Sequence, residues 1–370
     1  MPSGLTKKHS TMVQGIAILL MLYHHFFLNP EAVPGISYGN LSLTMHTAWF
    51  GKLCVGLFCF VSGYGMYHVC TRCNHRTLKT FLVEAFSTCL SRIGRLFIRL
   101  WAVILVVKGL TLFFQGSFFD QRELLLNMFA INLTYNGSWW FVRLYAVMLL
   151  VLPFLDLFFT SFTTRKETIL KWLALISLST LVAGLFCYGA LHSPESRYIL
   201  FMVKSSLPPV FLLIFSIGYL FARFAIYERI DHRLCGLSNA ITFAFSLFSL
   251  FLVITLRVIL TREASFATLD FIFVPVFIYG LIPLLNHSRS LSAFLGFFGR
   301  ISTYLWLTHV LIYDITVDPL ADLFRPYGGM PSTLFYLTQL LLSGAIAFLF
   351  TALETSFSHV VSSIKPHKRV

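Results

Sequence analysis

The chain has 370 residues, of which 57% are hydrophobic and only 12% are charged, and 40 of them are phenylalanines. Soluble domains are about 25% charged, and a single hydrophobic core stops growing near about 250–300 residues, so a water-soluble fold could not bury this much apolar surface. The net charge of +13 comes from short Lys and Arg clusters between apolar runs, not from one basic face or tail. This pattern argues against nucleic-acid binding and predicts a membrane protein whose solvent is the lipid bilayer.

Stretches of about 20 mostly apolar residues, the length that crosses a bilayer as a helix, occur about ten times along the chain. They cover residues 12–29, 47–70, 94–114, 138–160, 169–190, 206–226, 239–260, 266–286, 299–316 and 332–355. No repeat, low-complexity tract or long linker divides them, so we predict one all-α, polytopic membrane domain over residues 1–370. The first stretch is too long for the apolar part of a cleaved signal, so we expect it to stay as the first span.

Lys and Arg gather on one side of these predicted spans. If the N-terminus is placed in the cytoplasm, about 19 of the 28 Lys and Arg residues fall on inner ends and inner loops, as the positive-inside rule requires. The opposite orientation would invert this bias. We therefore predict that both termini are cytoplasmic, which requires an even number of spans.

The first predicted span contains two adjacent histidines, His24 and His25, in the stretch QGIAILLMLYHH. An ionisable side chain in hydrocarbon is costly unless it is paired or faces a cavity, so both are candidate functional residues. They point about 100° apart on a helix, so at least one needs a partner on a neighbouring helix. Gln14 shares a face with His25, about 16 Å away along the axis, which suits a reaction fed from both sides of the membrane. The alternative is that both histidines only pack near the outer interface.

The second predicted span carries a stripe of small residues around Gly56, Cys59 and Ser62, which allows close helix packing. Ser62 has no base beside it in the sequence, so we do not expect it to act as a nucleophile. Cys70 and Cys73 form one half of a zinc spacing that has no second half, so we predict no metal site. The seven cysteines lie mostly in apolar runs, so we expect no structural disulfides.

Residues 76–92 mix charged and apolar side chains, which predicts a separate helix lying on the inner leaflet, and residues 121–131 predict the same on the outer side. Arg92, Arg95 and Arg99 follow at spacings that place them on one helical face. They either anchor the third span at the cytoplasmic surface or form a cluster that binds the phosphates of a nucleotide-bearing donor.

Three further polar residues lie within or at the ends of later predicted spans. His309 falls in the middle of the ninth span and is a candidate site residue by the same cost argument. Arg257 and Asp270 face each other across the short connection between the seventh and eighth spans. A pair between them would be structural.

Several of these stretches together resemble the bacterial membrane acyltransferase family called acyltransferase 3. QGIAILLMLYHH is similar to that family's first helix, in which ten residues separate an arginine from a histidine, and His25 stands in the histidine position. VGLFCFVSGY resembles its phenylalanine-rich SG signature, and Arg92 and Arg95 match its RxxR motif. GRISTYLWLTH, which contains His309, resembles a later landmark. The likeness covers most of the chain in order, with a matching span count.

The resemblance implies transfer of an acyl group, usually acetyl, from cytoplasmic acyl-CoA to a hydroxyl of a surface or secreted glycan, a lipid-linked sugar or a small molecule. In that mapping His25 is the general base that deprotonates the acceptor hydroxyl, and Arg92 and Arg95 hold the donor phosphates. The residues expected to orient the substrates or the base are His24, Ser62 and His309. Acyl-CoA is then a substrate, no bound cofactor is expected, and the predicted location is the bacterial inner membrane.

One position departs from the family pattern, because Gln14 stands where the family has its arginine. An amide cannot pair with a phosphate as a guanidinium does, so donor binding at Gln14 is less supported and an altered activity stays open. Two other classes of function are also open. A glycan or lipid transporter would carry inverted repeats and paired broken spans, of which the sequence shows neither, and a non-catalytic membrane subunit would fit the loss of the arginine.

Overall fold

The computed structural model describes residues 4–28, 35–73, 77–116, 120–160, 209–234, 238–260 and 269–364, with isolated positions at 167, 170, 171, 174, 177 and 181. These residues are almost wholly helical, and the strand residues among them form one short parallel pairing between β1 (Ile36–Ser37) and β2 (Met330–Pro331). Seven of the described helices are long and apolar enough to cross a membrane, or eight if one bent pair counts as a span. The prediction of an all-α, polytopic membrane protein is therefore confirmed.

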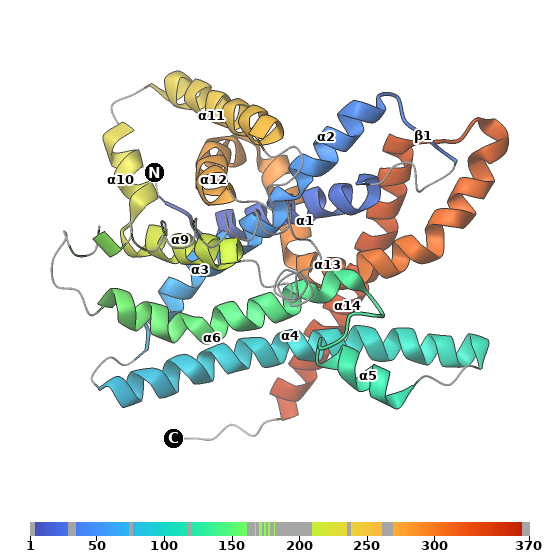
Figure 1. The fold of residues 1–370 in the computed structure, drawn as a ribbon, viewed down its shortest axis with the longest axis horizontal. Helices are drawn as coiled ribbons and strands as arrows, with labels where there is room; N and C mark the ends of the chain where they lie inside the picture. The colour runs from blue at the N-terminus through green and yellow to red at the C-terminus, as the bar shows by residue number, and fades with distance from the viewer. Residues whose placement is uncertain are drawn as a thin grey trace.

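The helices follow the chain in the order drawn in Figure 1. Their bounds are α1 Lys7–Phe27, α2 Leu41–Gly51, α3 Leu53–Cys70, α4 Leu78–Gln115, α5 Gln121–Met128, the 3-10 turn η2 Gly137–Trp139, α6 Trp140–Thr160, α9 Pro209–Arg223, α10 Ile226–Leu234, α11 Asn239–Leu260, α12 Asp270–His287, α13 Arg289–Phe324, the 3-10 turn η3 Arg325–Tyr327 and α14 Ser332–Ile364.

Eight of the ten predicted spans have a counterpart among the candidate membrane helices. The predicted span 299–316 lies inside the longer helix α13, which is not one of those candidates. The predicted span 169–190 lies outside the continuously described residues.

The prediction of a separate interfacial helix over residues 76–92 is wrong, because α4 continues without a break from Leu78 to Gln115. A capping box starts it, in which the Thr77 hydroxyl accepts from the Thr80 amide and the Thr80 hydroxyl accepts from the Thr77 amide. A single interior glycine costs a helix only about 1 kcal/mol, so Gly94 does not end it. The predicted segment 121–131 does form its own short helix, α5.

The helix pair α9 and α10 is bent by 56° at the break between them. Ala225 at this break has a φ of 48°, in the left-handed region that non-glycine residues rarely adopt. The sequence predicted no broken span, so this is a difference from the expectation. It is a single break within the described ranges, whereas inverted-repeat transporters carry such breaks in pairs.

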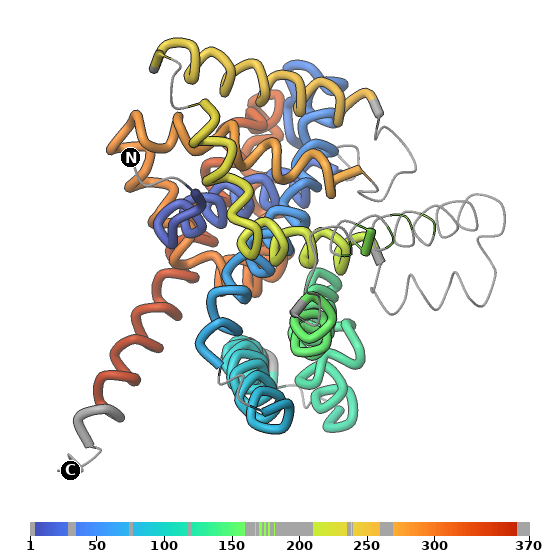
Figure 2. The backbone as a smooth tube through the Cα atoms, turned by 90° about the vertical axis from the view of Figure 1, so that its left-hand side faces the viewer, coloured from blue at the N-terminus to red at the C-terminus, as the bar shows by residue number. Residues whose placement is uncertain are grey.

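Helices α1 and α3 form the interior of the molecule, and α4 and α11 lie at opposite sides (Figure 1). About half or more of the span residues are buried in α1 (50%) and in α2–α3 (61%), against 22% in α4 and in α11. The tube in Figure 2 shows α4 and α6 side by side and the C-terminal part of α14 leading away from the other helices. The interior helices are therefore the ones available to line a site.

Reciprocal glycine contacts bring these interior helices together. A Cβ on Gly63 of α3 would lie 1.9 Å from the Phe215 carbonyl oxygen of α9, and a Cβ on Gly218 of α9 would lie 2.1 Å from the Phe60 oxygen of α3. In α1 and α13, a Cβ on Gly15 would lie 2.0 Å from the Leu295 oxygen. Such distances leave no space for a side chain, so the helices pack backbone against backbone.

We expect Gly63→Ala to destabilise the protein by about 1–3 kcal/mol, because its methyl group would overpack the contact with α9. Gly65→Ala on the same helix is the matched control, since a Cβ there meets nothing within 4 Å. The measurement is thermal unfolding of both variants in the same detergent. Equal melting temperatures for the two variants would contradict the packing argument.

Candidate active site

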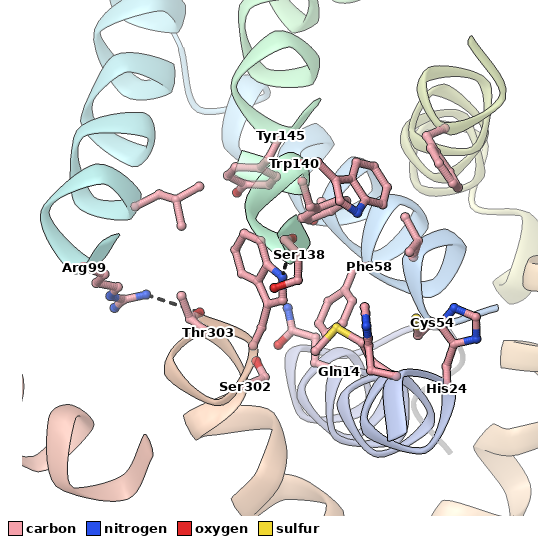
Figure 3. Close-up of a pocket in the computed structure, with 18 of the residues that line it drawn as sticks. Gln14, His24, Cys54, Phe58, Arg99, Ser138, Trp140, Tyr145, Ser302 and Thr303 are labelled. Atoms are coloured by element: carbon pink, nitrogen blue, oxygen red, sulfur yellow. Dashed lines mark hydrogen bonds between the residues drawn. The ribbon is translucent and has the colours of Figure 1, made fainter. Parts of the chain in front are cut away.

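A cavity of about 540 Å³ opens among α1, α3, α4, α6 and α13 (Figure 3). Both polar and aromatic side chains line it. They are Gln14, Met21, His24, His25, Lys52, Cys54, Val55, Phe58, Ser62, Arg92, Arg95, Leu96, Arg99, Ser138, Trp140, Phe141, Tyr145, Phe211, Ser302, Thr303 and Trp306. Seven residues were predicted from the sequence to act in catalysis or substrate binding, and six of them share this cavity: Gln14, His24, His25, Ser62, Arg92 and Arg95. The seventh, His309, packs its ring against that of His25.

His24 is held by a backbone carbonyl of the neighbouring helix. Its Nδ1 lies 2.7 Å from the Ala48 carbonyl oxygen in α2. Because a carbonyl only accepts, Nδ1 carries the proton and donates, which leaves Nε2 as the acceptor. His24 therefore has a defined tautomer and orientation at one end of the cavity.

His25 points into the cavity between two other imidazole rings. Its ring centroid lies 5.4 Å from that of His24 and 5.0 Å from that of His309 on α13. The His25 side chain is exposed although it sits among interior helices, because one side of its ring faces the cavity. A base for an incoming substrate needs this combination of a surrounded ring and an open face.

His309 supports His25 from behind. It is completely buried, and its Nδ1 donates to the Trp306 carbonyl oxygen at 2.7 Å. Its Nε2 is buried and has no hydrogen-bond partner among the described residues. A buried acceptor without a partner is costly, and the ring beside it is that of His25, at 5.0 Å between centroids.

The three arginines of α4 form the other end of the cavity, and they are not equivalent. Arg99 is paired with Glu354 of α14 in a two-pronged ion pair, with Nε 3.0 Å from Oε2 and Nη2 3.0 Å from Oε1. Arg92 contacts the Tyr145 hydroxyl, and Arg95 is exposed and donates from Nε to the Ser91 carbonyl oxygen at 3.3 Å. No Asp or Glu is among the described residues that line the cavity, so this end favours an anion.

Tryptophans lock the cavity wall between α13 and the start of α6. The Trp306 indole donates to the Ser138 carbonyl oxygen at 3.3 Å, and the Trp139 indole donates in return to the Leu307 carbonyl oxygen at 3.0 Å. Such long-range pairing leaves no local signal in the sequence.

Lys52 is the charged residue, among the described residues that line the cavity, that the sequence interpretation missed. It lies at the corner between α2 and α3 and lines the histidine end of the cavity. A signal was present, because Lys52 falls inside the predicted span 47–70 and a charge within a span marks a functional site.

A protein-family model described as an acyltransferase domain matches residues 11–353, nearly the whole chain. The chain belongs to this acyltransferase family. Searches of curated proteins and of solved structures gave no match. The protein is therefore a multi-pass membrane acyltransferase. Family membership favours an enzyme over the transporter and non-catalytic interpretations.

The acyltransferase also contains the predicted pair between Arg257 of α11 and Asp270 of α12. The Arg257 guanidinium donates from Nε to Asp270 Oδ1 at 2.8 Å and from Nη2 to Asp270 Oδ2 at 3.1 Å, and both side chains are buried. Arg257 Nη1 donates in addition to the carbonyl oxygens of Trp49 and Phe50 at 2.9 and 3.0 Å. The pair thus holds the end of α2, which carries the Ala48 carbonyl that orients His24.

We expect Arg257→Met to destabilise the acyltransferase by about 3–5 kcal/mol, because it leaves the Asp270 carboxylate buried without its cation. Arg325→Met is the control, since the Arg325–Asp322 pair is exposed and contributes at most about 1 kcal/mol. Thermal unfolding in detergent measures both. A stability loss no greater in Arg257→Met than in Arg325→Met would overturn this assignment.

Proposed function

We propose that this enzyme transfers an acetyl group from cytoplasmic acetyl-CoA to a hydroxyl of a glycan or lipid-linked sugar, in a bacterial inner membrane. One observation carries the proposal: one cavity joins the histidine pair to an arginine cluster, with no carboxylate among the described residues that line it. A base and a phosphate-binding surface that share one cavity are what acyl transfer from a nucleotide-bearing thioester requires. The family membership supports acyl transfer itself.

In the proposed reaction His25 is the general base. Its ring nitrogen takes the proton of the acceptor hydroxyl while the hydroxyl oxygen bonds to the thioester carbonyl carbon. The carbon–sulfur bond then breaks, and the CoA thiolate receives the proton from the His25 imidazolium. His309 and His24 flank the His25 ring at 5.0 and 5.4 Å between centroids and would limit its rotation.

The donor would bind along the α4 end of the cavity. Arg92 and Arg95 form no ion pair with a carboxylate in the part of the chain that the structure describes, so their charges are available to phosphates, whereas Arg99 is compensated by Glu354. Gln14 lines the same cavity. Its side-chain amide matches the amide groups of a pantetheine arm rather than a phosphate, which would explain how donor binding tolerates the loss of the family arginine.

We expect His25→Ala to lower acetyl transfer by about 10²–10⁴-fold, the usual contribution of a positioned general base. His68→Ala is the control, because His68 is exposed on α3 and does not line the cavity. The measurement is incorporation of labelled acetate into glycans by membranes supplied with labelled acetyl-CoA. Full transfer by His25→Ala would remove this residue as the base.

We expect Arg95→Glu to raise the KM for acetyl-CoA about tenfold or more, because it replaces a charge-assisted phosphate contact with repulsion. The KM for the acceptor should change little. Lys79→Glu, the same charge reversal at an exposed position of α4 outside the cavity, is the control. If both variants keep the wild-type donor KM, the arginines act only as anchors in the membrane surface.

A further inference from the structure

Lys52 is a cation at the histidine end of the cavity for which the proposed acyl transfer has as yet no role. It lines the same cavity as His24 and His25. The arginines lie on α4, whereas Lys52 lies at the corner of α2 and α3. The cavity therefore holds positive charge from two separate elements.

The corner that carries Lys52 packs directly on the histidine pair. A Cβ on the preceding residue, Gly51, would lie 2.6 Å from the Leu20 carbonyl oxygen and 3.1 Å from the His24 Cβ. Ala48, one turn earlier, accepts the His24 hydrogen bond. Residue 52 therefore directly follows a residue whose backbone contacts α1 at His24.

Buried hydrogen bonds fix this corner independently of the Lys52 side chain. Arg257, itself paired with Asp270, donates to the Trp49 and Phe50 carbonyl oxygens, and the Lys52 amide donates to the same two carbonyls. The backbone position of residue 52 is therefore set before any substrate binds. A charge carried on a fixed backbone needs less reorganisation during a reaction than one on a mobile segment.

The charge requirements of acyl transfer differ at the two ends of the cavity. The phosphates of the donor are permanently negative and are matched by the α4 arginines. Near the base, negative charge appears only in the transition state, on the carbonyl oxygen of the thioester. A fixed cation there stabilises the transition state more than the ground state, which is the condition for a higher rate.

We propose that the Lys52 ammonium stabilises the oxyanion that forms when the acceptor attacks the thioester. This inference rests on the proposed function. As the acceptor oxygen bonds to the carbonyl carbon and His25 takes its proton, the carbonyl electron pair moves onto the oxygen beside Lys52. When the C=O bond reforms, the C–S bond breaks, and the thiolate leaves with its electron pair and takes the proton from His25.

The test is release of CoA from acetyl-CoA by the full chain in lipid nanodiscs, with water as the acceptor. Water carries no charged group, so this readout separates oxyanion stabilisation from recognition of an anionic acceptor. We expect Lys52→Met to lower kcat by about 10²–10³-fold, the usual effect of removing one oxyanion-stabilising group, while the KM for acetyl-CoA stays near wild type. Lys52→Arg, which keeps the charge, should retain more activity than Lys52→Met.

Lys108→Met is the matched control, because Lys108 of α4 contacts the Tyr135 ring and does not line the cavity. Binding of CoA and the melting temperature are measured for each variant, so that a misfolded variant is recognised. A wild-type kcat in Lys52→Met, or a change confined to KM, would overturn the role of Lys52 and leave the acyl transfer standing. No CoA release by the wild-type chain, either with water or with a glycan hydroxyl as the acceptor, would overturn the proposed function and this inference together.

Discussion

Gly15 and Gly299 let α1 and α13 cross with their backbones in contact, and the geometry of the site follows from this crossing. Gly15 meets the backbone at Leu295, one turn before Gly299, and Gly299 meets the backbone at Thr11, one turn before Gly15. These two contacts set the register of the helices. His25 and His309 each lie ten residues further along their own helix, and there their rings meet. Any side chain at either glycine would separate the two imidazoles, so the closeness of the helices and the chemistry depend on the same contact.

Much of the fold and part of the site could be predicted from the sequence, because bilayer length and the cost of buried charge act locally along the chain. The histidine pair was found because an ionisable side chain in hydrocarbon is costly. The arginine cluster was found from its helical spacing, and the Arg257–Asp270 pair from its place across a short connection between predicted spans. The continuity of α4 was missed because charged residues near its start were weighed above the absence of any helix-ending signal. The close packing of His25 on His309 and the role of Arg257 in holding α2 depend on contacts between distant segments, which no local pattern encodes.

Arg257 also explains how a polar site is built in an apolar surrounding. Inside a bilayer each backbone carbonyl that leaves a helix must find a donor within the protein. The corner after α2 exposes the carbonyls of Trp49 and Phe50, and the guanidinium satisfies both while its own charge is matched by Asp270. A corner can therefore exist at this point, and with it a lysine beside the histidines.

The length of α4 has a consequence for the route of the donor. Its 38 residues extend about 57 Å, and even a tilt of 40° leaves about 44 Å along the membrane normal. The hydrocarbon layer is about 30 Å thick, so part of α4 must lie outside it. On the predicted orientation, the protruding part is the N-terminal end, which leads up to Arg92 and Arg95. A highly charged nucleotide could then dock without leaving the aqueous phase, and only its thioester arm would enter the membrane.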